Sequence, residues 1–289
     1  MGDCVLTTPA IELLHAARPD LQIGVVVEEA YDGVFEGNPA IAAIMEPESQ
    51  VLRSWRPALA LNLHGGTRSM MLTYSSGARF KAGFGHHRGS SIIYTVRIPR
   101  AQKIFEDERA VHTAEHLASA MFYLGVPISK VPRARLFADK NPPRRPYAVI
   151  HPTAAAEYKT WPIGRFREVA EHIQRVHGLE PVFIGGETDD LSEFHSYRRM
   201  VGAAISSVKA LLSDAALFVG NDSGPAHMAA ALNLPVAVIY GRVEHTTTWA
   251  PWKAKDARAF CSALGIESVE TADVIQGIDE LMRAPAKTR

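Results

Sequence analysis

The sequence predicts an α/β protein built from two doubly wound units that face a central cleft. Two observations carry this prediction. The chain has 289 residues, which exceeds the usual size of a domain built around a single hydrophobic core. In addition, short apolar runs alternate with segments of helical periodicity. The runs that predict strands cover residues 23–27, 59–63, 148–150, 182–184, 217–219 and 236–240. Such apolar strands are typical of parallel sheets with helices on both faces.

A segment rich in Arg and Pro, residues 131–146, separates the two halves. It has little helical or strand periodicity, so we interpret it as an interdomain linker. We place the boundary near Asn141, which gives domains of residues 1–140 and 141–289.

The first helix is predicted from Thr8 and Pro9, because proline suits the first helical position, and Ile11, Leu13 and Leu14 supply its apolar face. A doubly wound unit normally begins with a central strand before its first helix. No apolar strand stands ahead of this helix, so we expect the N-terminal unit to lack its first strand. The alternative is that Met1 is an internal methionine of a longer reading frame.

Composition excludes several classes of protein. The chain has 31 basic residues (Lys and Arg) and 31 acidic residues (Asp and Glu), so its net charge does not attract nucleic acid. Any anion-binding site must therefore come from a local group of residues. The two cysteines, Cys4 and Cys261, lie nearly a chain length apart and predict free thiols in a reducing compartment. With no apolar run of about 18 residues and no signal peptide pattern, we expect a cytoplasmic protein.

The most informative stretch covers residues 217–232, where an apolar strand, a tight turn and an Ala-rich helix follow one another. Pro225 suits the first helical turn, and Ser223 or Gly224 suits the cap. The first amides of such a helix, together with its positive end, favour a diphosphate. Many turns between a strand and a helix use the same residues for structure alone, with Asp222 as a cap.

The wider pattern resembles glycosyltransferase family 9, the ADP-heptose:lipopolysaccharide heptosyltransferases. The resemblance rests on five stretches in family order: Gly2-Asp3 with residues 6–11, Leu63-His64-Gly65 with Arg68, His151-Pro152-Thr153 with Lys159-Thr160-Trp161-Pro162, Gly185-Gly186-Glu187, and Asn221-Asp222-Ser223-Gly224-Pro225-Ala226-His227 followed by residues 234–241. It implies a GT-B fold of two Rossmann-like domains. The N-terminal domain then serves the acceptor and the C-terminal domain binds the nucleotide-sugar.

The resemblance assigns the donor site to the C-terminal half, with Thr153, Lys159, Glu187, Asp222, Ser223, Gly224 and His227 as its residues. Lys159 would contact the phosphates, and Ser223 and Gly224 would face them by hydroxyl and backbone amide. Asp222 would bind a sugar hydroxyl, because a carboxylate repels a diphosphate. Glu187 would accept the ribose hydroxyls, although it could instead begin a helix ahead of Asp189 and Asp190. His227 is either a ligand contact or a packing residue.

Three further groups of residues are predicted for catalysis and for the acceptor. Asp3 resembles the family's catalytic base, and Lys159 shares the catalytic role by stabilising the leaving group. Arg68, with His64 near it in the sequence, would bind an anionic acceptor. The alternative is that Arg68 is an ordinary surface arginine. A basic stretch over residues 79–88 would meet the acceptor or membrane headgroups, or be a solvated loop.

The predicted activity is inverting transfer of heptose, or a related sugar, from an ADP-sugar to a lipid-linked saccharide of the lipopolysaccharide core. No cofactor and no metal are expected, since Lys159 and the helix end replace a divalent ion, and peripheral contact with the cytoplasmic face of the inner membrane is compatible with this role. Two alternatives stay open: a sugar-nucleotide epimerase of GT-B fold, and a nucleotide-sugar binder impaired by the missing strand.

Overall fold

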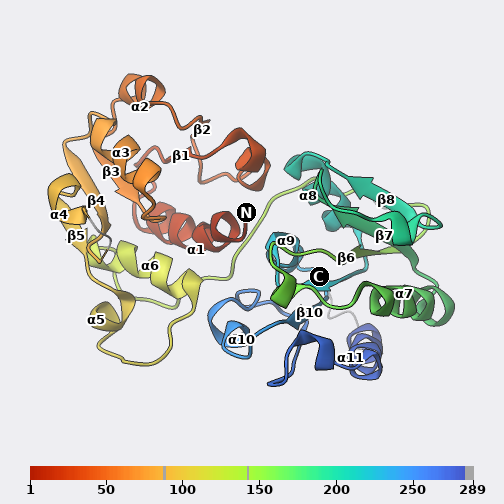
Figure 1. Ribbon diagram of the computed structural model, residues 1–289. Coiled ribbons are helices and arrows are strands. Elements are labelled where there is room, and N and C mark those ends of the chain that lie inside the picture. The colour runs from red at the N-terminus through yellow and green to blue at the C-terminus, as the bar shows by residue number, and fades with distance from the viewer. Residues whose placement is uncertain (87–88, 142, 284–289) are drawn as a thin grey trace.

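Figure 1 shows the computed structural model of the chain, with two α/β halves side by side. The structure describes residues 1–86, 89–141 and 143–283. Of the predicted basic stretch, residues 87 and 88 lie outside the described residues, as does Pro142 of the predicted linker. The boundary near Asn141 stays a prediction.

The C-terminal half contains a six-stranded parallel sheet. Its strands are β6 (Tyr147–His151), β7 (Glu180–Gly185), β8 (Arg198–Val201), β9 (Leu217–Asn221), β10 (Val236–Tyr240) and β11 (Ala257–Cys261). They lie in the order β8-β7-β6-β9-β10-β11, with every neighbouring pair parallel. This order confirms the predicted doubly wound unit, because the direction of winding reverses between β6 and β9.

Helices cover both faces of this sheet because its central strands are apolar on both sides. Val149 packs with α8 (Ile205–Asp214) and α9 (Gly224–Ala231) on one face. Ile150 packs with α7 (Ile163–His172) and α11 (Thr271–Arg283) on the other. The short helical elements are η2 (Glu157–Lys159), η3 (Ile173–His177, a π-helix), η4 (Ser192–Phe194), α10 (His245–Thr248) and η5 (Ile266–Ser268).

The N-terminal half differs from a single doubly wound sheet. The described residues form two separate parallel sheets, β1 (Gly24–Val26) with β2 (Ala43–Met45), and β3 (Leu59–Asn62), β4 (Phe80–Phe84) and β5 (Val96–Ile98) in that order. The helical elements are α1 (Gly2–Ala17), η1 (Glu29–Val34), α2 (Ser49–Trp55), α3 (Thr67–Ser75), α4 (Ser90–Ile93), α5 (Ala101–Phe105) and α6 (Thr113–Tyr123). No strand joins the two sheets within the described chain.

The start of the first helix was predicted wrongly. Helix α1 begins at Gly2 and includes Pro9 in its interior. A proline there cannot donate to the carbonyl four residues earlier, that of Val5. The Thr8 hydroxyl donates to that carbonyl at 2.8 Å, so the acceptor stays satisfied and the helix continues.

Helix α1 belongs to the cores of both halves. Leu6, Ala10 and Leu13 pack with β4, β5 and α6 in the N-terminal half. Val5 and Ile11, on its other side, belong to the core that includes α8, α9 and the six-stranded sheet. Burying two faces of one helix couples the packing of the two halves.

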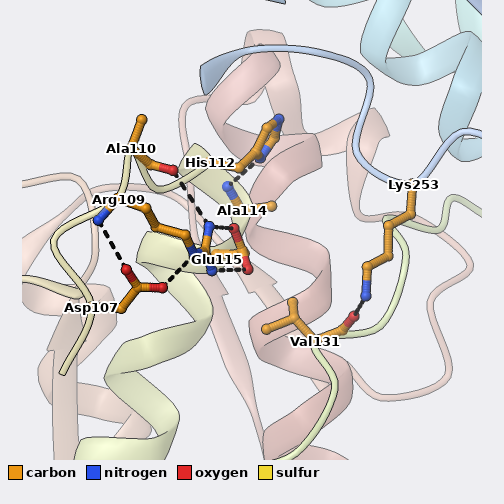
Figure 2. Close-up of polar contacts among 8 residues, drawn as sticks. All are labelled: Asp107, Arg109, Ala110, His112, Ala114, Glu115, Val131 and Lys253. Atoms are coloured by element: carbon orange, nitrogen blue, oxygen red, sulfur yellow. Dashed lines mark hydrogen bonds and ion pairs between the residues drawn. The ribbon is translucent and has the colours of Figure 1, made fainter. Parts of the chain in front are cut away.

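A segment after α10 also ties the halves together (Figure 2). The His112 ring accepts from the Ala114 amide at 3.0 Å through Nδ1, so its other nitrogen, Nε2, carries the proton and donates to the Ala250 carbonyl at 2.7 Å. Lys253 donates to the Val131 carbonyl. Beside them, Arg109 forms a two-pronged ion pair with Glu115, which fixes the loop ahead of α6.

The state of the cysteines and the length of the helices can be compared with the predictions. Cys4 and Cys261 are free cysteines, as predicted. Among the described residues no helix is both long and apolar enough to cross a bilayer.

Candidate donor site at the switch point

The candidate site lies where the order of the six-stranded sheet reverses. Strand β6 ends at His151 and its neighbour β9 ends at Asn221. In open parallel sheets, ligands bind outside the carboxyl ends of the two strands at such a reversal, because the following loops diverge there. The predicted donor residues after β6 and after β9 therefore share one edge of the sheet.

Asn221 fixes the two loops against each other. Its side chain is fully buried, accepts from the Trp161 amide at 3.1 Å and donates to the Pro152 carbonyl at 2.8 Å. Gly220 permits this approach, because a Cβ atom there would lie 2.8 Å from the His151 carbonyl oxygen. The loop that carries Thr153 and Lys159 is thus held beside the turn between β9 and α9.

That turn leads directly into helix α9. Ser223 occupies the N-cap position with extended backbone, and Pro225 stands in the first turn, as predicted. The Ser223 side chain does not cap its own helix. Met1 lies against Gly224, since a Cβ atom on Gly224 would be 2.5 Å from the Met1 sulfur. The start of α1 therefore meets the start of α9, and only glycine fits between them.

Asp222 forms the centre of a charged group. Its carboxylate, 5% exposed, accepts from Lys159 Nζ at 2.7 Å and lies 3.2 Å from His245 Nδ1. The Lys159 side chain is 22% exposed, so it remains reachable from solvent. A buried carboxylate needs such partners, because desolvation of an unpaired charge is costly. Asp222 therefore holds Lys159 at the edge of the turn.

A second chain of hydrogen bonds links the ends of three strands. The Thr153 hydroxyl donates to Asp189 at 2.6 Å, and the Gly186 amide donates to the same carboxylate oxygen at 2.7 Å. Thr153 Oγ1 also lies 3.2 Å from His151 Nε2, and His151 Nδ1 lies 2.9 Å from Ser223 Oγ. The loops after β6, β7 and β9 are thereby connected.

The donor and acceptor of each hydrogen bond in this series can be assigned by starting from Asp189, which only accepts. Thr153 gives its only hydroxyl proton to Asp189, so it must accept from His151 Nε2. Burial lowers the pKa of His151 to about 4, which keeps the ring neutral. Nδ1 is then the acceptor, and the Ser223 hydroxyl donates to it. In this arrangement the Ser223 hydroxyl proton is held by His151, and the contact of Ser223 with a phosphate stays a prediction.

His227 is buried in α9 beneath the start of α1. Its Nδ1 atom has no hydrogen-bond partner in the fully described helix and its surroundings, and a Cβ atom on Gly2 would lie 3.1 Å from its ring. Burial lowers its pKa to about 4. The ring is buried as in a packing residue, but its Nδ1 atom is unpartnered among the described residues, so both predicted roles stay predictions.

Glu187 lies exposed just beyond the end of β7, beside Gly202. The alternative prediction of a helix start at Asp189 and Asp190 is wrong. Asp189 and Asp190 follow the turn at Glu187 and Thr188 without regular secondary structure, and only the three-residue η4 comes after them. Asp189 instead accepts from Gly186 and Thr153, which uses its carboxylate to close the loop. Glu187 has no hydrogen bond or ion pair with the rest of the described chain.

Asp3 lies in the first turn of α1, exposed. The first turn of α1 packs against the start of α9, because Met1 contacts Gly224 and Gly2 contacts His227. The structure thus brings the helical turn that carries Asp3 to the start of α9, more than 200 residues later in the sequence.

The two predicted acceptor residues lie close in sequence after β3, His64 in the turn that follows the strand and Arg68 at the start of α3. Asn62 Oδ1 accepts from the amides of His64 and Gly65, both at 3.0 Å, which shapes that turn. Arg68 follows in the first turn of α3 and pairs with Glu28 at 2.7 Å, with its side chain 67% exposed. Within the described chain these residues form no hydrogen bond or ion pair with the turn at Ser223.

Sequence reasoning missed three groups at this edge. His151 was noted only as part of a motif, Asp189 only as a helix start, and His245 not at all. A signal existed for His151, because it directly ends a buried strand. None existed for His245, which lies at the start of α10, 23 residues after Asp222, and contacts it only in the folded chain.

The fold is that of a two-domain GT-B protein, and the predicted donor residues after β6 and β9 lie at its switch point. The model of the family described as glycosyltransferase family 9 (heptosyltransferase) matches residues 49–274. That match covers most of the chain, so the chain belongs to glycosyltransferase family 9 and is a glycosyltransferase.

Known proteins agree with this assignment. The chain is 26% identical to lipopolysaccharide heptosyltransferase 3 of Escherichia coli, with 97% of this chain and 96% of that protein aligned. Its fold is similar to a glycosyltransferase family 9 structure from Veillonella parvula DSM 2008, with a TM-score of 0.83, 21% identity, and 97% and 94% of the chains covered. It is also similar to the E. coli ADP-heptose lipopolysaccharide heptosyltransferase II structure, with a TM-score of 0.81, 17% identity, and 96% and 94% covered.

Proposed function

We propose that this chain transfers a heptose from ADP-heptose to the saccharide core of lipopolysaccharide, with inversion at the anomeric carbon. The observation that carries the proposal is the meeting of Lys159 with the start of α9 at the switch point, a place suited to a sugar diphosphate. The names of the similar E. coli proteins supply the donor and the acceptor.

The donor would lie along the edge from β7 to β9. Glu187, exposed at the end of β7, accepts the ribose hydroxyls. The diphosphate lies at the Gly224 amide and the Lys159 ammonium, which would turn from Asp222 toward it. Ser223 and Thr153 both contact His151 and so keep the loops after β6 and β9 in place. When Lys159 turns to the diphosphate, Asp222 keeps its contact with His245.

The reaction would join the acceptor oxygen to the anomeric carbon as the bond from that carbon to the diphosphate breaks. Asp3, exposed in the first turn of α1, takes the proton of the acceptor hydroxyl. Lys159 and the positive end of α9 stabilise the departing ADP, so we propose that no divalent metal takes part. The two groups act from opposite sides of the sugar, as inversion requires.

The acceptor would approach from the N-terminal half. His64 lies in the turn after β3 and Arg68 in the first turn of α3, and the exposed guanidinium of Arg68 suits an anionic sugar or phosphate. The lipid part of such an acceptor would bring the protein to the inner membrane from the cytoplasm, as a peripheral contact.

A radiolabelled transfer assay with ADP-heptose and a heptose-deficient lipopolysaccharide core tests the proposal. We expect label in the saccharide with the wild-type chain, and a loss of turnover of about 100-fold or more with Asp3→Asn while ADP affinity stays within about twofold. The matched control is Asp20→Asn, which changes an exposed carboxylate just beyond the C-terminal end of α1. ADP-heptose binding without any transfer would instead support a nucleotide-sugar binder.

The metal-free step has its own measurement. Turnover should stay unchanged after dialysis against EDTA and on addition of Mg²⁺, because Lys159 and the helix end supply the positive charge. EDTA inhibition that Mg²⁺ reverses would contradict this part of the mechanism while leaving the donor and acceptor assignments standing.

A further inference from the structure

Two histidines and an aspartate meet on the outer side of the six-stranded sheet, apart from the site above. Nε2 of His172 and Nε2 of His177 each lie 2.8 Å from Oδ1 of Asp279. His172 ends α7, His177 ends the π-helix that continues it, and Asp279 lies on α11. The three potential ligand atoms lie within 4.8 Å of one another. The donor set is that of a transition-metal site.

The π-helix is what brings the two histidines together. Residues five apart in an α-helix point about 140° away from each other, because each residue turns the chain by about 100°. Hydrogen bonds from residue i to i+5 place such residues on the same side instead. The rings of His172 and His177 accordingly lie 5.8 Å apart, edge to face. Single turns of π-helix are frequent at functional sites.

We propose that His172, His177 and Asp279 bind one Zn²⁺ ion, with water completing a four-coordinate site. Zinc binds imidazole nitrogen at about 2.0–2.1 Å and carboxylate oxygen at about 2.0–2.2 Å, so ligand atoms of a tetrahedral site lie roughly 3.3 Å apart. The present 2.8 Å contacts with Asp279 would lengthen by about 0.5 Å, and the two histidine nitrogens, which lie within 4.8 Å of each other, would take a similar separation. Each neutral ring would carry its proton on Nδ1 and offer Nε2 to the metal.

The surroundings suit such an ion. The side chains of His172 and His177 are 13% exposed and that of Asp279 is 19% exposed, so the cluster is sheltered but reachable. Arg283 lies 3.8 Å from Oδ2 of Asp279, on the oxygen that does not face the histidines. Arg283 would therefore help to orient the Asp279 carboxylate without binding the metal itself.

The position assigns the ion a structural role. Helix α7 runs back from the carboxyl edge of the sheet, so its last residue lies at the amino edge, across the sheet from Ser223 and Lys159. The ion would join the end of α7 and the π-helix to α11, the last helix that the structure describes. It is therefore independent of the transfer reaction and of the proposal that transfer needs no metal.

Calorimetric titration of the full chain with ZnCl₂, after removal of any polyhistidine tag and dialysis against EDTA, tests this site. We expect one Zn²⁺ per chain, and an affinity at least tenfold weaker in His172→Gln, His177→Gln and Asp279→Asn. His195→Gln, which changes an exposed histidine outside the cluster, should bind as the wild type does. Glutamine and asparagine can keep a hydrogen bond across the cluster, and circular dichroism checks that each variant folds.

Two further measurements separate a metal site from a hydrogen-bonded cluster. Zn²⁺ should raise the melting temperature of the wild type but not that of His172→Gln/His177→Gln, and Mg²⁺ should raise neither. Co²⁺ in place of Zn²⁺ should give the visible absorption of a four-coordinate ion, absent in the double variant. Zn²⁺ binding that is equal in the wild type and the double variant, or no binding, would overturn the proposal.

Discussion

At the scale of single residues, the site depends on how buried polar groups share protons and charge. Ser223, His151, Thr153 and Asp189 form one directed chain, in which each proton already has an acceptor. Lys159 is different, because its ammonium has a flexible stem, partial exposure and one carboxylate partner. It is the group at this edge that can exchange its present partner for a phosphate at small cost.

Lys159→Ala should weaken ADP binding by about 10- to 100-fold. A hydrogen bond to a charged group contributes about 1.5–3 kcal/mol, and the variant also leaves the Asp222 carboxylate without its cation beside the diphosphate. Isothermal titration with ADP measures the change, with Lys103→Ala on the surface of α5 as the control. An unchanged affinity would remove Lys159 from the donor site.

The two buried histidines predict how stability varies with pH. The pKa values of His151 and His227 fall to about 4 in the folded chain, below the ordinary value of about 6.5 for histidine. Between these values the unfolded chain binds more protons, so the free energy of unfolding decreases as pH falls from about 6.5 to about 4. Above about pH 7 these two residues add no slope.

His227→Leu should reduce that slope. The variant removes one of the two depressed groups and an unpartnered buried nitrogen, so it should cost little stability at pH 7.5. Urea unfolding midpoints at pH 7.5, 6.5, 5.5 and 4.5 measure the effect, with His195→Leu, on the surface, as the control. An equal slope in His227→Leu and wild type would contradict the buried neutral ring.

At the scale of elements, the sequence predicted the strands whose residues are apolar on both faces. The strands β6, β9 and β10 are fully buried and were all found. The two edge strands of the six-stranded sheet were not, because β8 reads Arg-Arg-Met-Val and β11 is partly exposed, so neither forms an apolar run. The pairing between distant side chains, such as His245 with Asp222, has no local pattern at all.

The start of α1 shows the same limit. Pro9 is a reliable sign of a helix but an ambiguous sign of where the helix begins. The structure resolves the ambiguity through Thr8, whose hydroxyl replaces the missing proline amide at the Val5 carbonyl and also accepts from the Arg135 amide at 3.2 Å.

Thr8→Val should therefore destabilise the protein by about 1–3 kcal/mol, although the side chain keeps its shape. It would leave the buried Val5 carbonyl and the Arg135 amide without a partner. Thr7→Val, which removes the more exposed hydroxyl that donates to the Asp3 carbonyl, should cost less. Chemical denaturation of both variants tests this, and equal losses would mean that the Pro9 gap is satisfied in another way.

At the scale of the whole molecule, α1 is the element that both halves share. Its Leu6 belongs to the core with β4, β5 and α6, and the adjacent Val5 to the core with α8, α9 and the six-stranded sheet. Neither half can lose α1 without opening its own core. The contacts of His112 with Ala250 and of Lys253 with Val131 add a second connection between the halves.

This sharing predicts that the two halves unfold together. Leu6→Ala should cost about 2–5 kcal/mol, since Leu6 is fully buried. For a chain of this size such a loss lowers the melting temperature by at least about 4 °C. In differential scanning calorimetry we expect one transition that moves as a whole, and Val5→Ala should lower that same transition. Leu264→Ala, at a side chain that is 85% exposed, should leave it in place. If Leu6→Ala instead split the trace into two transitions and shifted one of them, the halves would be energetically separate, and α1 would belong to the N-terminal core alone.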